Sequence, residues 1–131
     1  MRKTLTATLY CLALCSPAIV QAQQVAGLEG AWAGYFSAPN GAKVKAEFTV
    51  RGTVGTWRAF VPQTQLRVNP CTERPHTVAI TEAAPGKFKL VIQASKTLDG
   101  CQDAHATVVL VEPNVLEGKF GDGRELSLKR K

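Results

Sequence analysis

The alternation of residue types from Lys43 to Arg51 is the feature that most constrains the fold. Every second residue is apolar, and the residues between are charged or polar. Because successive side chains of a strand point to opposite faces of a sheet, a period of two predicts a strand with one face in a core. The apolar set is Val44, Ala46, Phe48 and Val50, and the polar set is Lys43, Lys45, Glu47, Thr49 and Arg51.

Short runs of the same kind occupy most of the remaining chain. Glycine and proline turns separate them, and no window has both the length and the 3.6-residue period of an amphipathic helix. This pattern predicts an all-β fold, a small antiparallel up-and-down barrel of eight or nine short strands, with a β-sandwich as the alternative. The further strands are expected at residues 28–37, 56–61, 65–68, 76–82, 87–94, 106–112, 115–120 and 124–129.

The first 22 residues have the pattern of an export signal. Arg2 and Lys3 precede an apolar run over residues 5–20, and Val20-Gln21-Ala22 supplies the small residues of a cleavage site. The apolar run is shorter than the roughly 20 residues that span a bilayer. We therefore expect a signal peptide at 1–22, one domain at 23–131 with no transmembrane segment, and a periplasmic or secreted location.

The charge of the chain is mildly basic. Its formal net charge is +6 over 131 residues, and removal of Arg2 and Lys3 lowers it to +4. A balance of this size favours solubility and weak attraction to acidic surfaces, and it does not indicate nucleic acid as a partner.

Cys71 and Cys101 are the two cysteines that remain after cleavage. Exported proteins oxidise such pairs, so a disulfide is expected. The alternative is a metal site of Cys71, His76, Cys101 and His105, although the spacings differ from those of zinc fingers and oxidation would consume both thiolates. We favour the disulfide and expect no cofactor.

The segment Gly30-Ala31-Trp32 resembles the Gly-x-Trp motif of the lipocalin and avidin group of exported β-barrels. In lipocalins this tryptophan closes the base of the barrel, and an arginine from the end of the barrel covers it. The resemblance implies that Arg124 or Arg130 covers Trp32 here. It supplies no ligand-binding residues, because neither the middle lipocalin motif nor the biotin-binding positions of avidin match this sequence.

No pattern of catalytic residues is present, since Gly-x-Ser-x-Gly turns, phosphate-binding loops and spaced carboxylate pairs are all missing. The sequence therefore favours a non-enzymatic binding module for a small apolar ligand held inside the barrel. The alternative is an interaction protein that binds an envelope protein or an anionic polymer through a basic outer face. That face would consist of Lys43, Lys45, Lys87 and Lys89.

Overall fold

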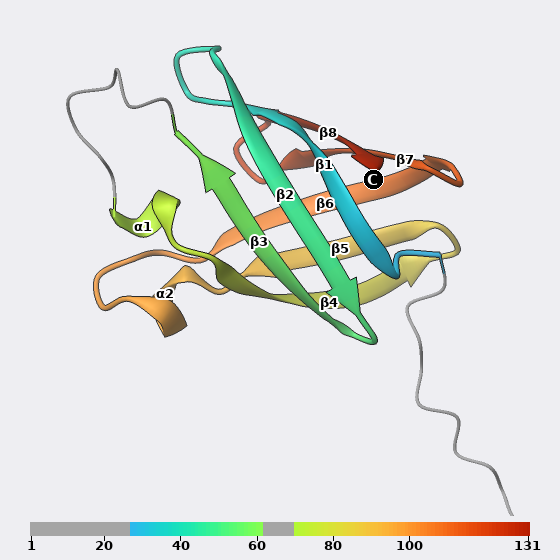
Figure 1. The fold of residues 1–131 in the computed structure, drawn as a ribbon, viewed down its shortest axis with the longest axis horizontal. Coiled ribbons are helices and arrows are strands. Elements are labelled where there is room, and N and C mark those ends of the chain that lie inside the picture. Colours follow the sequence, from blue (N-terminus) through green and yellow to red (C-terminus); the bar gives the residue numbers. More distant parts are fainter. Residues whose placement is uncertain (1–26, 62–69) are drawn as a thin grey trace, which may run out of the picture.

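The computed structural model describes residues 27–61 and 70–131. Eight antiparallel strands form one closed barrel in which each strand pairs with the next and β1 pairs with β8 (Figure 1). The all-β up-and-down barrel is thus confirmed and the β-sandwich is excluded. The elements in chain order are β1 (Gly30–Ser37), β2 (Lys43–Arg51), β3 (Val54–Phe60), α1 (Pro70–Glu73), β4 (His76–Ala84), β5 (Lys87–Ile92), α2 (Ala94–Thr97), β6 (Ala104–Glu112), β7 (Val115–Phe120) and β8 (Glu125–Arg130).

Two parts of the sequence interpretation lie outside the described residues: the signal peptide at 1–22 and the strand at 65–68. Elsewhere the strands follow the predictions with small shifts at their ends. The fifth strand ends at Ile92 instead of 94, because Ala94 is buried as the first residue of α2. Within the described ranges, no helix is long and apolar enough to cross a membrane.

The barrel interior is filled by the protein's own side chains. Inward-facing residues from all eight strands form one apolar cluster, in which Trp32, Phe48 and Phe88 are completely buried. Trp32 lies near the start of β1 and Phe36 near its end. The rings of Phe36 and Phe120 meet edge to face with their centroids 5.6 Å apart, and Trp57 packs against both. Aromatic pairs in this geometry add stability beyond the apolar area that they bury.

Two glycines allow neighbouring strands of the barrel to approach each other closely. A Cβ atom added to Gly34 in β1 would lie 2.0 Å from the Ser127 carbonyl oxygen in β8, and one added to Gly118 in β7 would lie 2.1 Å from that of Thr107 in β6. Real Cβ atoms do not come so near to backbone oxygens. Glycine at these points therefore permits an approach between neighbouring backbones that any side chain would block.

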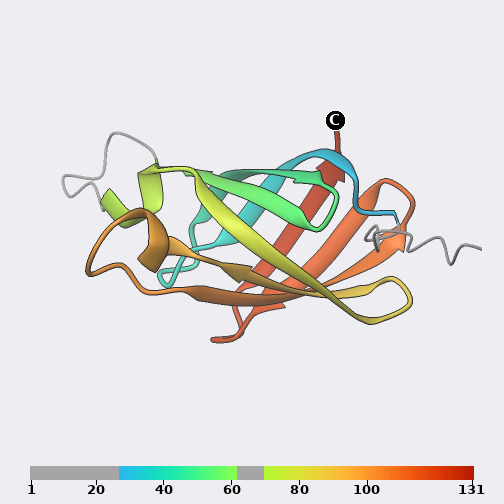
Figure 2. The ribbon, with the colours of Figure 1, turned by 90° about the horizontal axis from the view of Figure 1, so that it is seen from below.

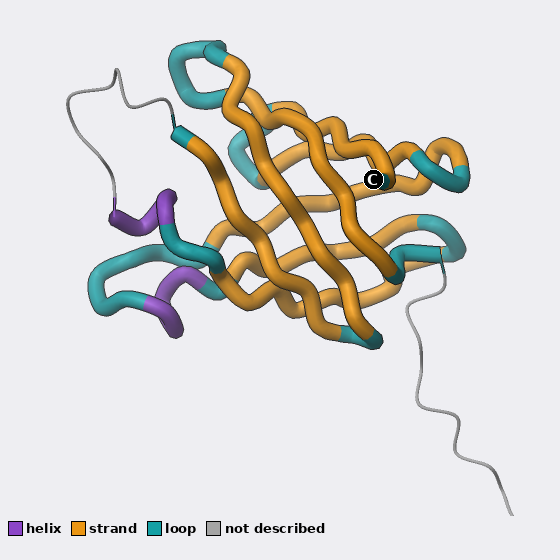
Figure 3. The backbone as a smooth tube through the Cα atoms, in the orientation of Figure 1, coloured by secondary structure: helices purple, strands orange, loops and turns teal. Residues whose placement is uncertain are grey.

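The two ends of the barrel differ. Figures 1 and 2 both place α1 and α2 side by side at one end, where the chain passes from β3 to β4 and from β5 to β6. Figure 3 shows these single helical turns set apart from the long strands of the wall. The opposite end has the β2–β3, β4–β5 and β6–β7 turns together with the start of β1, and we call it the base.

Candidate functional site

The base of the barrel is built around Trp32. The indole is completely buried, and its Nε1–H donates a hydrogen bond to the Leu28 carbonyl oxygen at 2.9 Å. The Arg130 guanidinium carbon lies 4.2 Å from the ring centroid, a distance suited to a cation–π contact.

Arg130 also holds the residues that precede β1. Its Nη2 donates to the Gly27 carbonyl oxygen at 2.7 Å, and its Nη1 donates to that of Glu29. Gly30, at a φ of +121°, leaves room for this side chain, because an added Cβ would lie 2.9 Å from Arg130 Nη1. The structure thus places Gly30, Trp32 and Arg130 together at the base.

Arg124 lies elsewhere, so the suggestion that it covers Trp32 is wrong. It precedes β8 at the end opposite the base, whereas Arg130 ends that strand. Its guanidinium carbon is 4.9 Å from the Phe120 ring centroid, and its Nε donates to Asp122 at 2.7 Å.

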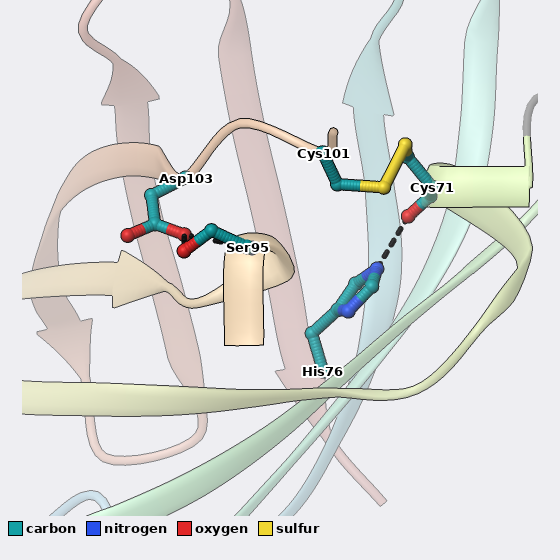
Figure 4. The surroundings of a disulfide bond; sticks show 5 residues. All are labelled: Cys71, His76, Ser95, Cys101 and Asp103. Carbon is teal, nitrogen blue, oxygen red and sulfur yellow. Dashed lines mark hydrogen bonds between the residues drawn. A yellow bond between two sulfur atoms is a disulfide. The ribbon is translucent and has the colours of Figure 1, made fainter. Parts of the chain in front are cut away.

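A disulfide joins the two loops that carry the helices. Cys71 in α1 is bonded to Cys101, which follows α2, with 5.6 Å between their Cα atoms (Figure 4). His76 lies beneath this bridge with 3% of its surface exposed, and its Nε2–H donates to the Cys71 carbonyl oxygen. Its buried Nδ1 has no hydrogen-bond partner.

The four residues proposed as metal ligands do not form one set. Both sulfur atoms are in the disulfide, His76 faces the interior, and His105 is exposed on β6. Across residues 27–61 and 70–131, no group of three or more His, Cys, Asp or Glu side chains could hold a metal ion.

Near His105, the Asp103 carboxylate accepts hydrogen bonds from the Ser95 hydroxyl at 2.7 Å and from the Ser95 backbone N–H at 3.0 Å, and these bonds lower the pKa of Asp103. That contact orders the start of α2 (Figure 4).

The four lysines proposed as a basic patch are also separated. Lys43 and Lys45 project from β2, and Lys87 and Lys89 project from β5. Strands β3 and β4 lie between them in the barrel wall, so the four do not form one surface and that prediction is wrong.

A groove with a volume of about 850 Å³ lies on the outside of the barrel across β1, β8, β7 and β6. Three side chains give it an apolar character: Tyr35, Val109 and Val111, which are 54%, 40% and 49% exposed. They are three of the four large hydrophobic side chains that are exposed among the described residues, and Val54 is the fourth. We call this the outer groove. Its other outward-facing residues are Ala33, Ser37, Lys43, Glu117, Lys119, Glu125, Ser127 and Lys129.

Charged side chains of both signs also line the outer groove, and Glu117 is the direct cross-strand neighbour of Val109. Lys119 and Glu125 are direct cross-strand neighbours, and Glu117 lies opposite Ser127. Neither of the two ion pairs found in the described parts of the chain, Arg124–Asp122 and Lys131–Glu47, involves a residue of the groove. The groove's lysines and glutamates are thus not held in ion pairs with one another.

The sequence interpretation did not identify this groove, although a signal was present. In β1 and β6, the outward positions that should be polar hold Tyr35, Val109 and Val111. Exposed apolar residues that gather on one face often mark an interaction site. Their common location becomes apparent only when β1 and β8 close the barrel.

No family model matches the sequence, and no curated protein matches it as a relative. Among solved structures, a redesigned beta barrel is similar, with 16% sequence identity and a TM-score of 0.48. The match covers 80% of this chain and 92% of that chain.

Proposed function

We propose that this protein is an exported, non-enzymatic binding module that holds its partner in the outer groove. The observation that supports the proposal is that Tyr35, Val109 and Val111, three of the four exposed large hydrophobic side chains among the described residues, all line the outer groove. Exposed large hydrophobic side chains that concentrate in one groove among polar residues often mark an interaction site. The proposal therefore assigns binding to the outside of the barrel wall.

The packed interior favours the outside over the inside. A small apolar ligand in the barrel would have to displace side chains such as Phe48, Phe88 and Leu90, which are 0–1% exposed. Small eight-stranded barrels are often filled in this way. The Trp32–Arg130 contact supports a barrel base of the lipocalin kind. The likeness concerns how the base is closed and does not extend to a ligand inside the barrel.

An anionic polymer is the second candidate partner, since Lys43, Lys119 and Lys129 all line the groove. The lysines are weaker support for this partner than the apolar residues are for the first, because Glu117 and Glu125 line the same groove and would repel a polyanion. Electrostatic binding of that kind would also weaken sharply with added salt.

Photo-crosslinking in the native host tests the location of the site. A photoreactive amino acid would replace Tyr35 in one variant and Val54 in a matched control, since these residues are 54% and 53% exposed and Val54 lies outside the groove. We expect a discrete adduct from position 35 and none from position 54. No adduct from position 35, or equal adducts from both positions, would refute the proposal.

A further inference from the structure

We propose that the outward face of β1, β2 and β3 is a second binding surface and that it holds a flexible anionic polysaccharide. The proposal goes beyond the outer groove, because it mainly concerns the strands on the other side of β1. It stands on three observations: an excess of basic side chains, the pairing of the single acidic side chain among them, and the spread of the basic side chains around the barrel wall.

Charge is distributed unevenly around the barrel. The charged side chains of β1, β2 and β3 are four basic ones and one acidic one: Lys43, Lys45, Arg51, Arg58 and Glu47. Strands β4 to β7 carry three of each sign: Lys87, Lys89, Lys119, Glu82, Glu112 and Glu117. Lys129 near the end of β8 and Lys131 just after it lie beside Ala33 and Ala31 of β1, so they extend the positive side. The surface that we call the basic face consists of Lys43, Lys45, Arg51, Arg58, Lys129 and Lys131.

The acidic side chain of this surface is already neutralised. Lys131 Nζ lies 2.8 Å from Glu47 Oε1, and this hydrogen bond lowers the pKa of Glu47, as do the charges of Lys45 and Arg58. In the part of the chain that the structure describes, neither Lys45 nor Arg58 forms an ion pair. Both lie over the Phe60 ring instead, with Lys45 Nζ 5.4 Å and the Arg58 guanidinium carbon 4.9 Å from its centroid. Cation–π contacts at exposed sites are weak, so both charges are available to an anion.

The spread of the cations around the wall favours a flexible chain. Lys129, Ala33, Glu47 and Arg58 form one cross-strand row over β8, β1, β2 and β3. The ends of this row are three of the eight strand-to-strand steps apart in a closed barrel, so the outward directions at its ends diverge by more than a quarter-turn. A flat anionic bilayer meets only part of such a convex face, and a small anion reaches only one or two of its cations. A flexible polyanion can follow the curve and contact them in turn.

The aromatic side chains of this surface favour a polysaccharide over a nucleic acid. Proteins that bind single-stranded nucleic acid stack successive bases on aromatic rings. Tyr35, Lys45 and Phe60 form one cross-strand row, and the Phe60 ring already faces two cations. Among the outward residues of β1, β2 and β3, this leaves Tyr35 as the one aromatic ring for stacking. An acidic polysaccharide is recognised through charges spaced along its chain, with a single ring to pack against a sugar, and this surface offers both.

Fluorescence anisotropy with a labelled galacturonate decamer tests the proposal. The matched probe is the same decamer with every carboxylate methyl-esterified. We expect the acid to bind at least about tenfold more tightly than the ester, and to bind more weakly as salt is added, because exposed charge contacts are screened. Vesicles of equimolar phosphatidylglycerol and phosphatidylcholine, and a thymidylate decamer, serve as competitors. At equal anionic charge, both should displace the labelled probe less well than unlabelled galacturonate does.

Two matched double variants locate the site. Lys45→Gln combined with Arg58→Gln should weaken binding of the acid about tenfold, because two exposed charge contacts are lost. Lys87→Gln combined with Lys89→Gln removes the same charge from β5, three strands away from β2, and should change binding less than about twofold. All four positions are exposed, so both variants should fold, and circular dichroism checks this.

The proposal is overturned if the acid does not bind at millimolar concentration, if the ester binds as tightly, or if the two double variants weaken binding equally. It is also overturned if vesicles or thymidylate compete better than galacturonate. Val109→Lys separates this surface from the outer groove, since Val109 lines the groove and lies outside the basic face. This variant should retain the acid, and loss of binding would place the polyanion in the groove and contradict the proposal.

Discussion

Replacing Trp32 with alanine should be among the most destabilising single changes in this protein. The indole is completely buried, and truncation of a buried tryptophan typically costs about 3–5 kcal/mol of unfolding free energy. The loss includes the hydrogen bond to Leu28, worth about 1 kcal/mol, and the Arg130 cation–π contact, worth about 0.5–2 kcal/mol. Because domains are usually stable by about 5–15 kcal/mol, this one change would remove a large share.

Urea unfolding followed by far-ultraviolet circular dichroism measures the effect without depending on tryptophan fluorescence. Trp32→Phe keeps an aromatic ring but leaves the Leu28 carbonyl without its donor, so it should cost about 1–3 kcal/mol. Tyr35→Ala, on the same strand but facing outward, is the control and should cost less than about 1 kcal/mol. The proposed role of Trp32 at the base is refuted if Trp32→Ala unfolds within about 1 kcal/mol of the wild type.

Three further predictions concern the barrel wall and the disulfide end. Gly34→Ala should lower the melting temperature strongly, because its Cβ would meet the Ser127 backbone at 2.0 Å, whereas Gly121→Ala has 3.9 Å of room and should change it little. Equal melting temperatures would contradict the close approach of β1 to β8. Replacing both disulfide cysteines with alanine should cost about 3–4 kcal/mol in urea unfolding, given their separation of 30 residues, and an unchanged midpoint would count against this. The hydrogen bonds from Ser95 lower the pKa of Asp103, so the stability that they contribute is present above about pH 3.8 and is lost as the pH falls through the folded-state pKa. Ser95→Ala should raise the pKa of Asp103 in a carboxyl titration. An unchanged pKa would exclude Ser95 as the cause.

Local patterns in the sequence predicted the strands well, because each strand has one face in a filled interior. In β2 the alternation of buried and exposed residues follows the alternation of apolar and polar residues, as a period of two requires. The end of β5 was less predictable, since the apolar Ala94 fits the inward face of a strand as well as the first position of a helical turn, where the structure buries it. Apolar periodicity alone does not separate these two cases.

The surface sites depended on pairing between strands that are distant in the sequence. Lys43 and Lys87 have similar local patterns, but their strands lie on different parts of the wall. Tyr35 and Val109 are 74 positions apart and share a groove because β1 closes on β8 and β6 lies two strands beyond it. Sequence patterns indicated which side chains face outward, and the closure of the barrel determined which of them meet.

The most direct test of an outer binding site is a native mass measurement of the protein gently isolated from its host, made in parallel on wild type and on Val109→Lys. Val109 faces outward in the groove and is 40% exposed, so its replacement should leave the barrel folded while replacing one of the groove's exposed apolar side chains with a charge. The account predicts that the wild type retains a partner, that Val109→Lys loses it, and that the dissociated wild-type chain carries no small molecule. A small apolar molecule bound equally by both proteins would place the site inside the barrel and contradict the account.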